Sequence, residues 1–313
     1  MLNTLMPFDL IDLTPIQFPV ALAPIDGVPE ARYKKVIRTD MDAPDNFMGM
    51  AGSRYKPISH EEAFTHAIDN LKKQNLSFEG AQGRLDVSGN GALAKIEVEF
   101  PAHRRTIGDQ PIHVKYVARN SLNGVWRYQS FFGWLNQICF NTLVSGEKLA
   151  YFSNRHTNRF DIDAANDSIR TAAKLITEPN SETLRCYRAW WHSPITDDEA
   201  RDVLKSSIAK SNATPDQVMD GVSGQNTKQL TLLMDKFRHE ATHIRGRGDY
   251  GRNHAQGTLW DLFQAGTSWS THLEDVLKIK NQPVVQQKRE EAVRKMVSMK
   301  KWKKLENQEA LAA

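Results

Sequence analysis

The pattern of hydrophobic and polar positions divides the chain into a strand-rich part followed by a helix-rich part. The clearest alternation has apolar side chains at Ala94, Ile96 and Val98 with charged side chains between them. Alternation with a period of two is typical of antiparallel strands that have one buried and one solvated face. Asn-Gly pairs beginning at Asn90 and Asn123 fit the turns between such strands. We therefore predict a meander of four antiparallel strands whose polar face is wet.

Helical spacing of apolar residues dominates after about residue 136. Ser59 with Glu62, and Thr196 with Glu199, have the spacing of capping boxes at helix starts. These predict helices from about 60 to 74 and from 196 to about 210. Further helices are expected over 162–191, 227–244, 258–278 and from about 284 onward. The expected fold class is α+β, with an antiparallel β-meander packed against helices and a helical C-terminal half.

The first 30 residues have a different pattern, with prolines at positions 7, 15, 19, 24 and 29. Proline fixes φ and lacks an N–H donor, so this stretch is expected to be an extended Pro-rich N-terminal arm. Its apolar residues predict that the arm lies on its own domain or on a neighbouring subunit. The expected organisation is therefore an arm over 1–35, one α+β domain over 36–280 (sheet-rich 49–135, helix-rich 136–280), and a basic helix or tail over 281–313.

Composition places the chain among ordinary globular proteins, with 313 residues, 40% hydrophobic and 25% charged. Its two cysteines, Cys139 and Cys186, argue against a disulfide framework, and both are expected to be buried thiols. No apolar run approaches the ~20 residues that cross a bilayer. A cytoplasmic protein without a membrane partner is expected. The formal net charge of +4 alone proves no anionic partner.

Basic residues gather in three segments, and the first lies on the predicted strands beside aromatic rings. Cations beside flat rings on one sheet face suit single-stranded nucleic acid, because phosphates meet the cations and bases stack on the rings. The alternative is that the rings pack in the core, which alternation predicts for about half of them. The candidate residues are Arg104, Arg105, Lys115, Arg119, Trp126 and Arg127.

The second segment is a loop rich in glycine and arginine, and the third is the C-terminal segment. Glycine lets backbone N–H groups approach a phosphate and arginine offers it a planar fork, although a flexible surface loop has the same composition. The C-terminal segment fits a basic amphipathic helix that attaches to nucleic acid or an acidic partner, or a solvated tail. The candidate residues are Arg245, Arg247, Arg252, Lys300, Lys301, Lys303 and Lys304.

One motif suggests chemistry, since His239, Glu240 and His243 match the H-E-x-x-H pattern of zinc hydrolases. Arginines bracket the motif, however, where a zinc-binding helix has apolar flanks. The alternative is a polar helix end near the negative pole of the helix dipole. We expect no cofactor and no enzymatic activity, and keep a zinc-dependent hydrolase as an alternative.

A set of short segments appears in order over about residues 35 to 275: 36–39, 50–58, 61–64, 138–143, 155–157, 257–262 and 271–272. Together they resemble the DUF932 family of phage and plasmid proteins. The resemblance implies a phage or mobile-element origin and a stand-alone domain, and it implies no catalytic residue, because the family name records an unknown function. The predicted meander followed by a helix is also similar in outline to Rad52-like single-strand annealing proteins.

The sequence thus favours an oligomeric, non-enzymatic protein that binds single-stranded DNA and takes part in annealing or recombination. A structural or host-interaction protein is the alternative outside nucleic-acid binding. The sequence leaves open whether a further polar group forms a site or only fixes loops. That group is Asn141, Thr142, Arg155, His156 and His272.

Overall fold

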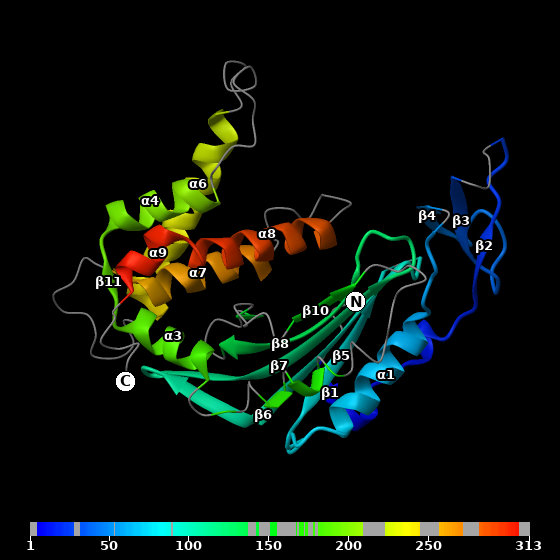
Figure 1. Ribbon diagram of the computed structural model, residues 1–313, viewed down its shortest axis with the longest axis horizontal. Helices are drawn as coiled ribbons and strands as arrows, with labels where there is room; N and C mark the ends of the chain where they lie inside the picture. The colour runs from blue at the N-terminus through cyan, green and yellow to red at the C-terminus, as the bar shows by residue number, and fades with distance from the viewer. Residues whose placement is uncertain are drawn as a thin grey trace. The chain divides into compact units, whose positions relative to one another are not determined.

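The structure is a computed structural model that shows two compact units (Figure 1). Unit 1 comprises Met1–Arg104, His113–Gly133 and Gly146–Glu178, and unit 2 comprises Arg105–Ile112, Trp134–Ser145 and Pro179–Ala313. The structure describes residues 5–27, 32–52, 54–88, 90–136, 142–143, 151–154, 167, 169–171, 173–174, 178, 181–208, 223–244, 257–271 and 282–306.

The main sheet confirms the predicted meander, since β5, β6, β7 and β8 are neighbours in chain order. Short strands flank them, so the order is β1-β5-β6-β7-β8-β10, with β9 also paired to β8. The strands are β1 (Met6–Pro7), β5 (Gln82–Val87), β6 (Leu93–Ile107), β7 (Gln110–Ser121), β8 (Tyr128–Asn136), β9 (Thr142–Leu143) and β10 (Tyr151–Asn154). Together with the helices below, these strands confirm the α+β fold class.

One face of the meander is apolar and is covered by α1 (His60–Lys72), which lies along the strands in Figure 1. The predicted helix start is confirmed, because the Ser59 hydroxyl accepts a hydrogen bond from the N–H of Glu62 at 3.0 Å. The sheet contributes side chains such as Ile96 and Val98, which are fully buried. Unit 1 therefore has its main core between α1 and this face.

A second, smaller sheet lies in unit 1, with strand order β2-β3-β4 and antiparallel pairing. Phe18, Val36, Met48 and Leu122 belong to the core beneath it. Its strands are β2 (Val20–Ala23), β3 (Tyr33–Arg38) and β4 (Phe47–Gly52). Alternation did not predict this sheet, because β2 is short and β4 contains a bulge.

The N-terminal segment packs on its own unit, which is the first of the two positions expected for the arm. Phe8, Ile16 and Phe18 are buried there. The segment is only partly extended, since it includes two 3-10 turns, η1 (Phe8–Leu10) and η2 (Thr14–Ile16), besides β1 and β2. Proline explains the short elements, because it interrupts both helices and strands.

Unit 2 is built mainly from helices around α7, which is buried over nearly its whole length. The capping box at Thr196 and Glu199 is confirmed, with both reciprocal hydrogen bonds present. Within the predicted helix over 162–191, the structure describes α3, which begins at Glu182 after the N-cap Ser181; most of residues 162–180 lie outside the described residues. The elements are α3 (Glu182–Trp191), β11 (Pro194–Ile195), α4 (Asp197–Ser207), α6 (Ser223–His239), the π-helix η4 (Glu240–Ile244), β12 (Gly257–Thr258), α7 (Leu259–Thr271), α8 (Gln282–Val297) and α9 (Lys300–Leu305).

The tip of the β6–β7 hairpin belongs to unit 2 and packs in its core. Gln110 accepts a hydrogen bond from the indole N–H of Trp260 at 2.7 Å. Gly108 turns the chain with φ +59° directly against the ring of Trp191. Within the described part of the chain, none of the helices is both long enough and apolar enough to span a bilayer.

Candidate nucleic-acid interface

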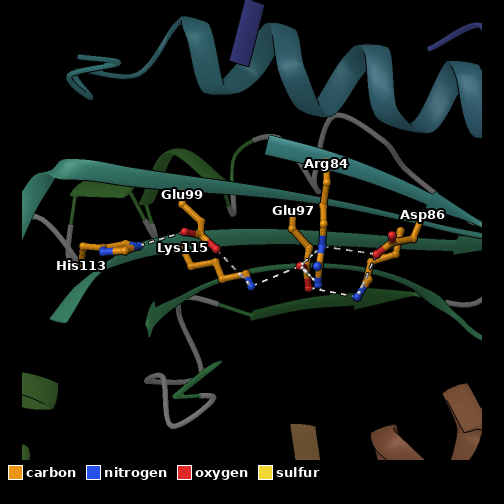
Figure 2. A network of polar contacts seen from close by, with 7 residues as sticks. Arg84, Asp86, Glu97, Glu99, His113 and Lys115 are labelled. Atoms are coloured by element: carbon orange, nitrogen blue, oxygen red, sulfur yellow. Dashed lines mark hydrogen bonds and ion pairs between the residues drawn. The ribbon is translucent and has the colours of Figure 1, made fainter. Parts of the chain in front are cut away.

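The face of the main sheet opposite α1 is lined with charged side chains from β5, β6 and β7 (Figure 2). Successive residues of a strand point to opposite faces, so these side chains alternate with the apolar ones that contact α1. They are Arg84, Asp86, Lys95, Glu97, Glu99, His113 and Lys115. This face includes one of the segments in which the sequence predicted nucleic-acid contacts.

Glu97 is at the centre of the network, where three cations converge on its carboxylate. The Oε2 atom lies 2.7 Å from Arg84 Nη2 and 3.2 Å from Lys115 Nζ. The Oε1 atom lies 3.0 Å from Lys95 Nζ. Burial alone would raise the pKa of Glu97, but the three positive charges outweigh burial and hold this pKa well below its ordinary value.

Two further carboxylates complete the charge balance. Asp86 lies 3.2 Å from Lys95, and Glu99 lies 3.6 Å from Lys115 and 3.3 Å from His113 Nε2. Three cations thus face three carboxylates, without counting His113 as charged. The lysines and the arginine of this network are neutralised by the protein itself.

The predicted wet face of the meander is therefore wrong for this part of the sheet. Glu97 and Lys115 are 5% exposed and Arg119 is 3% exposed. Removing these charges from water costs free energy, and pairing across neighbouring strands compensates this cost. Charges on a solvated face would not need such pairing.

Aromatic residues of β8 and its preceding turn also lie inside the protein. Trp126, Tyr128, Phe131, Phe132 and Trp134 are all buried, whereas the sequence predicted that about half of the rings belong to the core. The guanidinium of Arg119 lies 5.6 Å from the centre of the Phe131 ring. The predicted grouping of rings and cations exists, but it lies inside the fold.

The other predicted cations differ in their surroundings. Arg104 and Arg127 are exposed, and Arg105 is partly buried. The glycine- and arginine-rich loop lies outside the described residues, and so do the side chains of the polar group that the sequence left open. These residues are Arg245, Arg247 and Arg252 of the loop, and Asn141, Thr142, Arg155, His156 and His272 of the polar group.

The C-terminal lysines lie on a helix that is anchored in unit 2. Trp302 is fully buried and contacts Trp190 edge to face at 5.1 Å. Lys301 Nζ lies 2.6 Å from Asp202, and Lys303 Nζ lies 2.9 Å from Glu306. Lys300 and Lys304 are exposed. The segment is thus a packed helix whose outward positions are basic.

At the H-E-x-x-H motif, His239 is exposed at the end of α6, whereas Glu240 is buried at the start of η4. The side chain of His243 lies outside the described residues. Among the residues that the structure describes, no three His, Cys, Asp or Glu side chains gather as metal ligands would. The zinc prediction stays untested.

A group of exposed cations surrounds the turn between β7 and β8; the sequence reasoning named Arg127 but missed Arg54 and Lys56. Arg54 and Lys56 flank Tyr55, whose hydroxyl donates to the carbonyl of Ser121 at 2.7 Å and whose ring packs beside Gly124. Arg127 follows this turn and is exposed. In the described part of the chain none of the three cations has a carboxylate within 4.0 Å. We call Arg54, Lys56 and Arg127 the turn cations.

The small sheet provides a second exposed feature beside this turn. Its outer face presents Tyr33, Phe47 and Met50, which are 52%, 46% and 60% exposed. The signal in the sequence was an aromatic residue between cations, Arg32-Tyr33-Lys34 and Arg54-Tyr55-Lys56. That signal does not distinguish exposed rings from buried ones, so it could not locate the surface alone.

Comparison with known proteins connects this fold to one family. No curated protein and no solved structure is similar enough to match the chain. Residues 47–302 match a family described as "Domain of unknown function (DUF932)". The match covers most of the chain, including strands β5 to β10 of the main sheet and the helices of unit 2 up to the start of α9. The chain therefore belongs to the DUF932 family.

Proposed function

We propose that this protein binds nucleic acid through the turn cations Arg54, Lys56 and Arg127. The observation that supports the proposal is that these three exposed side chains surround one turn and have no carboxylate partner in the described part of the chain. Residues 47–58 and 117–128, which form this region, contain no Asp or Glu. A local excess of unpaired positive charge attracts phosphates and is not offset by neighbouring anions.

The charge distribution elsewhere favours this region over the centre of the main sheet. Lys95 and Lys115 face Glu97 at 3.0 and 3.2 Å, so a phosphate there would have to displace a carboxylate. The turn cations require no such displacement. Arg104 of unit 1 and Lys300 and Lys304 of unit 2 are further exposed cations.

The finer part of the proposal is that an oligomeric form anneals complementary single strands in the cytoplasm of a phage or mobile-element host, without a cofactor. The features that support it are the β-meander next to a helix and the exposed cations. Mixing two labelled complementary strands with the protein measures annealing directly. Sedimentation of the free protein measures its oligomeric state. If the protein binds no nucleic acid, this result would favour the structural or host-interaction role instead.

The test is a fluorescence-anisotropy titration of a labelled oligonucleotide over a series of salt concentrations. Binding should weaken with salt, by about 0.7 in log–log slope for each phosphate contact on a single strand. The triple variant Arg54→Gln, Lys56→Gln, Arg127→Gln should lose affinity and lower the slope by about 2.

A matched triple variant removes the same charge from exposed cations elsewhere, Lys73→Gln, Lys205→Gln and Lys288→Gln. It should retain the wild-type slope if the turn cations form the contact. Equal losses in the two triple variants would reject the turn as the site. An absence of salt-dependent affinity for any oligonucleotide would reject nucleic-acid binding altogether.

A further inference from the structure

The small sheet β2-β3-β4 has two different faces. Its inner face contributes Val36, Met48 and Ala51 to a buried core. Residues directly opposite each other on antiparallel strands share a face, so the pairing of Val36 with Gly49 also belongs to the inner side. The register shifts between Val36 and Ile37, so Met48 of β4 has no partner and lies on the inner side, whereas Phe47 lies on the outer side.

The outer face forms a ladder of three cross-strand pairs. Tyr33 lies opposite Gly52, Lys35 opposite Met50, and Ile37 opposite Phe47. The order along the face is therefore a ring, then a cation with a thioether, then a second ring. The rings are about 13 Å apart along the strands, since each residue advances about 3.3 Å. We call Tyr33, Lys35, Phe47 and Met50 the ladder.

Exposed apolar side chains are concentrated here. The described part of the chain has six large hydrophobic residues that are exposed, and five of them lie on this sheet, in its β3–β4 loop or in the β7–β8 turn. The five are Tyr33, Met41, Phe47, Met50 and Val125, and Leu10 is the sixth. Three of these residues, Tyr33, Phe47 and Met50, share the outer face of the sheet, and shared exposure of this kind marks an interaction surface.

We infer that the ladder stacks the unpaired bases of a single-stranded nucleic acid, whose phosphates contact Lys35. The inference rests on the proposed function and specifies its substrate class. Exposed rings on a sheet face offer stacking platforms to bases of any sequence. A duplex keeps its base faces inside the helix, so it cannot use the two rings.

The charges on this surface favour nucleic acid over a second copy of the chain as the occupant. Lys35 lies at the centre of the ladder and its only carboxylate neighbour in the described residues, Asp26 at 3.8 Å, is itself fully exposed. An apolar protein interface would have to bury this ammonium group, which is costly without a partner. A phosphate backbone would supply the missing anion. Residues 31–39, which include β3, contain four cations and no Asp or Glu.

The test compares single-stranded and duplex oligonucleotides of equal length by fluorescence anisotropy. The double variant Tyr33→Leu, Phe47→Leu retains apolar bulk but removes both rings. It should weaken single-strand binding by about tenfold or more while the affinity for duplex stays unchanged. Both side chains are about half exposed, so the variant should fold, and circular dichroism with a thermal melt checks this. Leu10→Ala serves as a control on an exposed apolar residue elsewhere.

The possible results are distinguishable. If wild type binds single strands and duplex equally and the ring variant changes neither, stacking is rejected while the turn cations stand as a phosphate site. If no oligonucleotide binds, the proposed function is rejected as well. If sedimentation shows a dimer that the ring variant dissociates while single-strand affinity stays intact, the ladder is a protein interface and the inference is overturned.

Discussion

The side-chain amide of Asn120 donates a hydrogen bond to Nδ1 of His60 at 3.0 Å, joining β7 to the first turn of α1. The other ring nitrogen of His60 then donates to the carbonyl of Gly91 at 2.8 Å. This arrangement requires a neutral imidazole, because Nδ1 must accept. Burial lowers the pKa of His60 to about 4.

The first prediction concerns pH. An unfolded histidine titrates near 6.5, so between about pH 6.5 and 4 the unfolded chain binds a proton that the folded chain does not. The stabilising contribution of His60 is therefore complete above about pH 6.5 and is lost as pH falls toward 4. The loss should be about 3 kcal/mol. Urea unfolding at a series of pH values measures it.

The control is His60→Gln, whose amide can donate to Gly91 and accept from Asn120 but does not titrate. The variant should show a shallower fall in the free energy of unfolding between pH 6.5 and 4. The low pKa of Glu97 also reduces stability in acid, but it affects both proteins alike. Identical slopes for the variant and wild type would contradict the assignment to His60.

A second prediction concerns the charged network. Glu97→Gln removes the negative charge on which Arg84, Lys95 and Lys115 converge, and leaves these three cations, of which Lys115 is buried, with only two carboxylates, Asp86 and Glu99. Removing one partner from a buried ion pair costs about 3–5 kcal/mol, so the free energy of unfolding should fall by this amount. Glu79→Gln, at an exposed position, should change it by less than about 0.5 kcal/mol. Equal effects from the two substitutions would show that the network is not stabilising.

A third prediction separates crowding from backbone strain at two glycines. Gly108 and Gly80 both have positive φ, +59° and +66°. A Cβ at Gly108 would overlap the ring of Trp191, whereas a Cβ at Gly80 would meet no atom within 4 Å. Gly80→Ala should therefore cost about 1–2 kcal/mol from the left-handed backbone alone, and Gly108→Ala clearly more. Thermal unfolding of the two variants ranks them, and a smaller effect at Gly108 would refute the close packing of the hairpin tip.

A fourth prediction concerns the C-terminal helix α9. Trp302→Ala should destabilise the protein by about 3–5 kcal/mol, because it empties a fully buried site beside Trp190. Lys304→Ala, two residues later but exposed, should leave the free energy of unfolding nearly unchanged. A mobile tail would instead tolerate both substitutions equally. Chemical denaturation followed by tryptophan fluorescence distinguishes these outcomes.

Local signals in the sequence were sufficient for the meander, for the start of α1 and for the capping box of α4. Each depends on residues within a few positions of one another, such as Ser59 with Glu62. The burial of the charged face could not be predicted in this way. Lys115 reaches Glu97 only because β6 and β7 are neighbours, and alternation alone does not give the cross-strand partner.

The sequence predicted that the candidate surface combines aromatic rings with cations, but it did not indicate which segment of the chain forms this surface. Rings beside cations occur both at Trp126–Phe131 and at Tyr33–Lys35, and the sequence does not indicate which of the two is covered by other parts of the chain. The structure buries Trp126 and exposes Tyr33. Burial of an aromatic residue depends on contacts with residues distant in sequence. The local pattern therefore favoured Trp126–Phe131, the longer run of rings, as the binding segment.

The hairpin tip at Arg105–Ile112 has a practical consequence for dividing this protein. It lies between two segments of unit 1 in the chain, yet it supplies Gln110 to Trp260 and Gly108 to Trp191 in unit 2. A fragment beginning at Pro179 would lack Gly108 and Gln110. A fragment ending before Pro179 would contain these two residues but leave them without Trp191 and Trp260. Cutting at one peptide bond therefore cannot release either half with a complete interior, and during synthesis the tip stays unpartnered until the later helices have left the ribosome.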